Sequence, residues 1–274
     1  MKHLRLRNGR MMPALGLGTY QLVGNDCYRT VRRALEIGYR HVDTAEAYHN
    51  EAEIGRALAD AAIIRDEIFL TTKIWPTHFR KNFMRLAVEH SLRKLGSDYV
   101  DLLLLHWPSK TIPLEETVEA LSNVVEQGKA KAVGVSNFAD PDMLILASNL
   151  GPAFCSCQLE YHALLKQTEA LRILDLNDIA AVAYSPIARG LIGDIQVLKS
   201  IGDKRNKTAA QVALRWLLQQ KGVGAVPKAS NSLRLVENFD IFDFELSPSE
   251  MDEIFAVPSG VRVVGDKSFP AKEV

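Results

Sequence analysis

The feature that most restricts the fold of this chain is an eightfold alternation of short apolar segments with amphipathic ones. Each apolar segment is rich in β-branched residues and short enough to be a strand, and the segment that follows has helical periodicity. Strands that are apolar almost throughout are typical of a parallel sheet buried on both faces. Eight such strand–helix units within about 215 residues predict an α/β protein with a closed (β/α)8 TIM barrel. An open doubly wound sheet is the alternative, but it usually has fewer units.

The predicted strands cover residues 14–20, 41–45, 68–75, 99–107, 131–138, 154–161, 179–186 and 223–230. The predicted helices cover residues 26–38, 50–62, 81–95, 114–128, 140–151, 167–177, 207–220 and 232–240. One barrel of this kind accounts for the whole chain, so we expect a single domain over residues 1–274.

Both ends of the chain carry additional elements. Before the first unit, Asn8-Gly9 predicts a small β-hairpin, which we expect to plug the N-terminal mouth of the barrel. After the last unit, Ser247, Pro248 and Glu250 form the start signal of a further helix. A short C-terminal tail follows Val257.

Composition excludes several classes of function. The chain has 33 basic and 33 acidic residues, and this balance argues against a nucleic-acid partner or a polybasic membrane surface. The N-terminus has no apolar core of a signal peptide, and no apolar run is long enough to span a membrane, so we expect a soluble, cytoplasmic protein. Three cysteines do not suggest a disulfide framework, and Cys155 and Cys157 are better explained as core residues than as redox or metal groups.

Catalytic residues of a barrel lie at the carboxyl ends of its strands, and three neighbouring strands end on polar side chains. The second strand ends at Asp43 with Tyr48 in the loop beyond, the third ends at Lys73 and the fourth at His106. Each residue alone has an ordinary explanation, such as a helix cap, a solvated lysine or a hydrogen-bonded rim residue. Because the strands are adjacent, we expect the four side chains to converge.

A carboxylate, an ammonium, a phenol and an imidazole together form an apparatus for protonating a carbonyl oxygen. The ammonium of Lys73 is expected to lower the pKa of Tyr48, Asp43 to hold that ammonium, and a neutral His106 to bind the substrate oxygen. No side chain resembles an activated nucleophile, and His41 with Asp43 provides only two potential ligands, so we predict no metal site.

The attacking group must therefore be held by the later strands. The segment "GLGTYQ" starts like a dinucleotide fingerprint but has Gln21 where the third glycine belongs, so it is better explained as a tight turn. Ser136, Asn137 and Gln158 can bind a carboxamide edge, and Tyr184 offers a ring for stacking. After the eighth strand, one of the residues 230–232 can cap a helix whose N-terminus suits an anion, with Lys228 and Arg234 nearby; ordinary surface charge is the alternative explanation for these two cations.

At this point the sequence resembles the aldo-keto reductase family over nearly its whole length. The matching motifs are "GYRHVDTAEAYHNEAEIGRAL", "TTKIW", "SDYVDLLLLHWP", "GKAKAVGVSNF", "AYSPIARG" and "VPKASNSLRLVEN". The resemblance implies a catalytic tetrad of Asp43, Tyr48, Lys73 and His106, in which Tyr48 is the general acid during reduction. It also implies a monomer that acts on a small carbonyl compound.

The resemblance further implies a bound nicotinamide cofactor, and Lys228 together with Arg234 favours NADPH over NADH. The residues implied in cofactor binding are Gly18, Thr19, Tyr20, Asp43, Ser136, Asn137, Gln158, Tyr184, Ser185, Leu191, Lys228, Ser230, Arg234, Glu237 and Asn238. The expected walls of the substrate pocket are Tyr20, Tyr48, Trp75, His106 and Trp107, with His49 as a further candidate. Aromatic walls favour uncharged or modestly polar carbonyl compounds.

The chain also departs from the family pattern. Cys157 and Ala163 replace the asparagine and proline of many relatives. The segment between Gly190 and Lys207 is expected to be a short loop, which reduces the cover over the cofactor pyrophosphate. The short tail resembles the bacterial branch that includes the 2,5-diketo-gluconate and methylglyoxal reductases, so small aldehydes, 2-oxoaldehydes and keto-sugars are the expected substrates.

Two other functions compete with carbonyl reduction. A nicotinamide-binding regulatory or sensor protein would bind the cofactor but turn over poorly. A barrel lyase or isomerase would use Lys73 as a Schiff base, which a charged lysine paired with Asp43 disfavours.

Overall fold

The computed structural model describes residues 2–138, 140–149 and 154–264, and an eight-stranded parallel sheet forms its centre. Consecutive strands of the sheet are neighbours, from β3 to β10. Their bounds are β3 (Leu17–Gly18), β4 (His41–Asp43), β5 (Phe69–Ile74), β6 (Leu102–Leu105), β7 (Val133–Ser136), β8 (Ser156–Glu160), β9 (Ala180–Tyr184) and β10 (Val223–Ala225). Each lies inside a segment that the sequence predicts as a strand.

Backbone contacts join the first and last strands of this sheet. Leu15 forms a parallel bridge with Ala225, and the amide of Gly16 donates to the carbonyl oxygen of Ala225 at 2.9 Å. One step further on, the amide of Gly18 donates to the carbonyl oxygen of Pro227 at 3.0 Å. The sheet therefore curls round on itself, which is consistent with the predicted (β/α)8 architecture.

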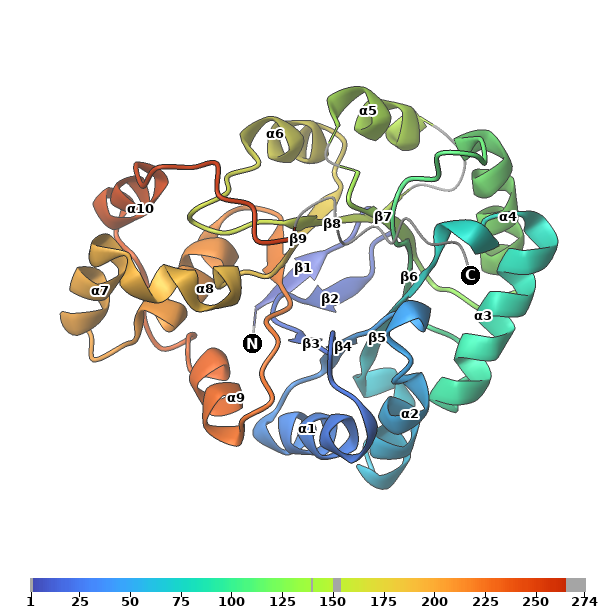
Figure 1. The fold of residues 1–274 in the computed structure, drawn as a ribbon, viewed down its shortest axis with the longest axis horizontal. Coiled ribbons are helices and arrows are strands. Elements are labelled where there is room, and N and C mark those ends of the chain that lie inside the picture. The colour runs from blue at the N-terminus through green and yellow to red at the C-terminus, as the bar shows by residue number, and fades with distance from the viewer. Residues whose placement is uncertain (1, 139, 150–153, 265–274) are drawn as a thin grey trace.

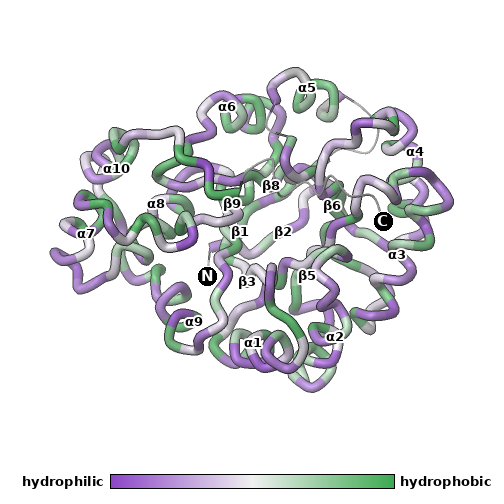
Figure 2. Tube along the Cα trace, in the orientation of Figure 1, coloured by the Kyte–Doolittle hydropathy of each residue, from purple (hydrophilic) through white to green (hydrophobic). Residues whose placement is uncertain are grey.

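A ring of helices surrounds the sheet, and one helix of this ring follows each strand (Figure 1). The ring consists of α1 (Gly24–Ile37), α2 (Glu51–Asp60), α3 (Lys81–Leu95), α4 (Leu114–Glu126), α5 (Pro141–Asn149), α6 (Thr168–Leu176), α8 (Ala209–Gln219) and α9 (Ser232–Phe239). All eight overlap the predicted helices, and residues 150 and 151 of the fifth prediction lie outside the described residues. Figure 2 shows hydrophobic and hydrophilic residues alternating along these helices, as expected when one face packs against the sheet.

The segment between Gly190 and Lys207 is not the short loop that the sequence predicts. The first residues of this segment complete the 3-10 helix η4 (Ala188–Asp194), and the next form α7 (Gln196–Asp203). In Figure 1, α7 lies farther from the sheet than α8. Leu198 and Ile201, three positions apart, bury the inner face of α7. This helix was missed because it is only two turns long and its apolar face has few members.

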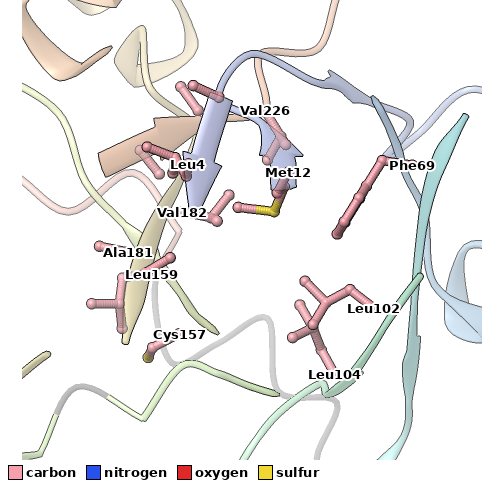
Figure 3. Close-up of a cluster of buried hydrophobic side chains, with 14 of the residues drawn as sticks. Leu4, Met12, Phe69, Leu102, Leu104, Cys157, Leu159, Ala181, Val182 and Val226 are labelled. Atoms are coloured by element: carbon pink, nitrogen blue, oxygen red, sulfur yellow. The ribbon is translucent and has the colours of Figure 1, made fainter. Parts of the chain in front are cut away.

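The N-terminal hairpin is present, formed by β1 (His3–Arg5) and β2 (Met11–Pro13). Gly9 has a φ of 84° in its turn, which agrees with the Asn8-Gly9 signal. Leu4 and Met12 are buried, and they belong to the same cluster of buried apolar side chains as Phe69 and Leu102, which begin β5 and β6 (Figure 3). The hairpin thus covers the N-terminal end of the strands, as predicted.

The chain after β10 completes the described fold. Helix α10 (Pro248–Phe255) starts with a capping box between Ser247 and Glu250, as the sequence predicts. Further 3-10 helices are η1 (Glu46–Tyr48), η2 (Arg65–Glu67) and η3 (Pro76–His78). The predicted tail is described as far as Val264, and residues 265–274 lie outside the described part. None of the described helices is long and apolar enough to cross a membrane.

Candidate active site

An ion pair between Lys73 and Asp43 lies at the carboxyl end of the sheet. Lys73 Nζ is 2.6 Å from Asp43 Oδ1 and donates a second bond to the carbonyl oxygen of Thr44 at 2.8 Å. Both side chains are almost fully buried, 1% and 4% exposed, because they sit on adjacent strands inside the curled sheet. Burial lowers the pKa of Lys73, while the charge of Asp43 and their hydrogen bond act against that shift. A lysine held in this way is a poor candidate for a Schiff base.

Tyr48 lies directly above this pair. It ends η1, and Lys73 Nζ is 5.1 Å from the centre of its ring. Burial, together with the negative charge of Asp43, raises the pKa of Tyr48 well above its usual value. The expectation that Lys73 lowers this pKa is therefore wrong in its net direction, because burial and the charge of Asp43 dominate. The phenol is protonated at neutral pH and available as an acid.

His106 follows β6 and completes the predicted set of four. Its ring centre is 5.5 Å from that of Tyr48 and 5.1 Å from that of Trp75, which stands perpendicular to it. Burial and the charge of Lys73 lower the pKa of His106 well below its usual value, so the imidazole is neutral. Its Nδ1 is buried with no hydrogen-bond partner among the described residues.

The polar residues on the next three strands form one hydrogen-bonded network. Gln158 Nε2 donates to Asp43 Oδ2 at 2.7 Å, which links β8 to the buried ion pair. Asn137 donates to the carbonyl oxygen of His106 at 2.9 Å and to Ser136 Oγ at 3.2 Å, and accepts from the hydroxyl of Tyr184 at 2.7 Å. Asn137 holds this position with a φ of 65°, in the left-handed region that asparagine tolerates.

A cavity of about 1210 Å³ brings most of the predicted residues together. Its lining includes Gly18, Thr19, Tyr20, Asp43, Tyr48, His49, Trp75, His106, Trp107, Ser136, Asn137, Gln158, Tyr184, Ser185, Lys228, Arg234, Glu237 and Asn238. Lys73 lies behind Asp43 and Tyr48 rather than on the surface of the cavity. Leu191 and Ser230 are exposed and lie outside the lining, so the structure does not bring these two to the site.

The end of the cavity beside α9 is positively charged. Lys228 and Arg234 are exposed there, and neither has an ion-pair partner within residues 2–138, 140–149 and 154–264. Helix α9 is capped by Asn231, whose side chain accepts from the amide of Leu233 at 2.8 Å. Glu237 accepts a bond from Thr208 at 2.6 Å. The cavity thus has cations at one end and amide and hydroxyl groups near Tyr48 at the other, and these could hold the two ends of a dinucleotide.

Several lining residues were not predicted from the sequence. Arg189 and Gly190 line the cavity at the start of η4, where both have positive φ values, and Gly193 follows them. Their motif "AYSPIARG" was noticed, but only for Tyr184 and Ser185. Glu46 accepts bonds from the backbone amide of Trp75 and, at 3.0 Å, from the ring of His78. Val264 joins the lining from the far end of the chain, and no local pattern could have revealed it.

The two departures from the family pattern are both buried, and neither lines the cavity. Cys157 is fully buried, with its Sγ 3.8 Å from the carbonyl oxygen of Phe138, and Figure 3 shows it among apolar side chains. Ala163 is also fully buried. Cys155 and Cys157 are buried thiols, as the sequence predicts. No three His, Cys, Asp or Glu side chains converge as metal ligands in the described part of the chain.

Comparisons with known proteins identify the family of the chain. Residues 14–257 match the model of the aldo/keto reductase family. The chain is 37% identical to methylglyoxal reductase DkgA of Escherichia coli over 268 residues, covering 96% of each chain, and 39% identical to glyoxal reductase of Bacillus subtilis over 261 residues, covering 95% and 94%. It superposes on the crystal structure of a putative 2,5-diketo-D-gluconic acid reductase B with a TM-score of 0.94 and 40% identity, covering 100% and 98%. The chain is therefore an oxidoreductase that belongs to the aldo/keto reductase family.

Proposed function

We propose that the protein reduces aldehydes and ketones to alcohols with NADPH, and that Tyr48 donates the proton. The observation that carries this proposal is the position of a protonated phenol and a neutral imidazole above one buried ion pair, inside one cavity. The membership of the family supports the reaction class.

Each of the four residues has a separate role in the reaction at the carbonyl oxygen. The neutral ring of His106 donates a hydrogen bond that orients the oxygen, because a neutral imidazole retains one N–H. Tyr48 then transfers its proton to that oxygen as negative charge develops on it. Lys73 stabilises the phenolate that remains, and Asp43 keeps Lys73 charged and in position.

The cavity fits a reduced nicotinamide cofactor. When bound, the cofactor supplies the hydride for the carbonyl carbon. Ser136, Asn137 and Gln158 would hold the carboxamide and Tyr184 would stack on the ring. Lys228 and Arg234 would bind the adenosine phosphate, with Arg189 as a further cation, which favours NADPH over NADH.

Small carbonyl compounds are the substrates that suit the other end of the cavity. Tyr20, Trp75 and Trp107 line it, and the ring of Tyr20 lies 5.1 Å from that of Tyr48. These walls favour uncharged or modestly polar molecules. The names of the relatives, which include methylglyoxal and glyoxal reductases, support 2-oxoaldehydes, and the structural neighbour supports keto-sugar acids as a second class.

The test is oxidation of NADPH and, separately, of NADH by the purified protein, followed by absorbance. Methylglyoxal, glyceraldehyde, an aromatic aldehyde and a diketo-sugar acid are offered in parallel. We expect rapid oxidation of NADPH with at least one of them and slower oxidation of NADH. Tight binding of NADPH with no turnover of any compound would contradict the proposal and favour a nicotinamide-binding sensor.

A further inference from the structure

A second buried carboxylate lies close to the active site but outside the catalytic set. Glu160 ends β8, two residues after Gln158, and its side chain is 0% exposed. Its Oε1 accepts from His162 Nε2 at 3.1 Å and from the backbone amide of Val263 at 2.6 Å. Its Oε2 accepts from the amide of Val264 at 3.2 Å and lies 3.7 Å from Arg262.

Arg262, Val263 and Val264 belong to a segment that we call the C-terminal strap, residues 257–264. The strap has two further attachments to the loop after β8. The amides of Gly260 and Val261 both donate to the carbonyl oxygen of Leu164, at 2.9 and 3.0 Å. Ser259 accepts from the amide of Lys166 at 2.9 Å. Every one of these contacts spans more than 90 positions in the sequence, so the strap is held by tertiary contacts rather than by its own helical or strand structure.

The strap also reaches the cavity that holds Tyr48. Val264 forms part of the cavity lining, although its amide is bonded to Glu160. Glu160 is paired in the sheet with Tyr184, which lines the same cavity. One side chain thus fixes the backbone of a residue that lines the same cavity as the ring that we assign to nicotinamide stacking.

We propose that Glu160 is a positioning residue that fixes the C-terminal strap, so that Val264 becomes a specificity-determining wall of the substrate pocket. Glu160 is well suited to this because an ionised carboxylate accepts several bonds at once, and His162, Val263, Val264 and Arg262 all provide donors or charge. The part of the proposal that concerns substrate choice depends on the reductase function proposed above.

The physical link is testable without any substrate. Glu160→Gln keeps the shape of the side chain but replaces one acceptor oxygen by an NH2 group. This donor then faces another donor, either a backbone amide or the ring of His162, and a hydrogen bond is lost. We expect the amides of Val263 and Val264 to exchange slowly with deuterium in the intact protein and at least about tenfold faster in the variant. Glu169→Gln is the control, because Glu169 is 56% exposed on α6 and pairs with Arg172 on the surface.

The functional part requires a comparison of substrates of different size. Val264→Ala removes methyl groups from the wall, and we expect it to change the ratio of kcat/KM between an aromatic aldehyde and methylglyoxal by about fivefold, mainly through KM. Glu160→Gln should change this ratio in the same direction while the Kd for NADPH stays within about twofold. The double variant should show little more change than the larger single one, since both act on one wall.

The outcomes separate the two proposals. Fast exchange of residues 263 and 264 in the intact protein, or equal exchange in Glu160→Gln, would overturn the role of Glu160 whatever the enzyme reduces. A different outcome is slow exchange of residues 263 and 264 in a protein that reduces none of the aldehydes. That result would overturn the reductase function and leave the bonding of the strap to Glu160 intact. If kcat falls equally for all substrates in Glu160→Gln and the ratio is unchanged, Val264 does not determine specificity.

Discussion

The two ends of the cavity are built in different ways. At the catalytic end, Lys73 and Asp43 are buried and already bonded, and Gln158 is bonded to the same carboxylate. At the α9 end, Lys228 and Arg234 extend into solvent without a partner in the described chain. The end with Lys73 and Asp43 is therefore preorganised, whereas the two cations at the other end are available to an anion.

This difference has consequences for what each end contributes. Buried, fixed dipoles need little rearrangement during the reaction, and this makes them effective in stabilising developing charge. Exposed cations attract an anionic ligand and help to select it, and they reduce the stability of the free protein only slightly. Mutations at the first end should therefore affect chemistry and folding, while mutations at the second should affect binding alone.

The largest effect is expected for Tyr48→Phe. Removal of the phenolic hydroxyl deletes the proton donor, and we expect kcat for aldehyde reduction to fall by about 10²–10⁴-fold. The Kd for NADPH, measured by quenching of protein fluorescence, should change by less than about twofold. Substantial remaining turnover would show that another group donates the proton.

Removal of the buried ammonium should affect the stability of the fold as well as turnover. Lys73→Met leaves the carboxylate of Asp43 buried without its cation, and we expect the free energy of unfolding to fall by about 3–5 kcal/mol. Urea denaturation measures this change. The matched control is Lys81→Met, which breaks an exposed pair with Glu119 and should change stability by less than about 0.5 kcal/mol. Equal losses of unfolding free energy in both variants would show that the buried ion pair is no more important to stability than the exposed one.

At the other end, Arg234→Ala should weaken NADPH binding by about tenfold through loss of a charged hydrogen bond to phosphate. The affinity for NADH, which lacks that phosphate, should change by less than about twofold, and the stability of the protein should not change. Isothermal titration with both cofactors tests this, with Arg29→Ala on the exposed face of α1 as the control. Equal losses for NADPH and NADH would place the phosphate elsewhere.

The smallest effect is expected in the pH dependence of reduction. Because the pKa of His106 is lowered and that of Tyr48 is raised, the imidazole stays neutral and the phenol stays protonated across neutral pH. The kcat for reduction should therefore be flat between roughly pH 6 and 9, without the break near 6.5 that an ordinary histidine produces. A break near that value that disappears in His106→Gln would contradict the proposed protonation state.

The sequence predicted the parts of this molecule that depend on local patterns. The strands could be found because their apolar runs are continuous, and Asp43, Lys73 and His106 because each directly follows such a run. The direction of the pKa shift of Tyr48 could not be found, since it depends on the balance of burial against two opposite charges. Val264 and Glu160 were missed for a related reason, because their contact joins segments about a hundred positions apart and leaves no periodic signal.

The carboxylate of Asp43 accepts from Lys73 with one oxygen and from Gln158 with the other. Suppose that a ligand strengthens the hydrogen bond between Gln158 and Asp43 when it binds. Thermodynamic linkage then requires that the same hydrogen bond, once formed, increases the affinity for that ligand. The binding of such a ligand at Gln158 and the state of the ammonium beside Tyr48 would consequently be coupled equilibria. Through two hydrogen bonds, a ligand held by Gln158 would change the surroundings of the tyrosine that we propose as the acid.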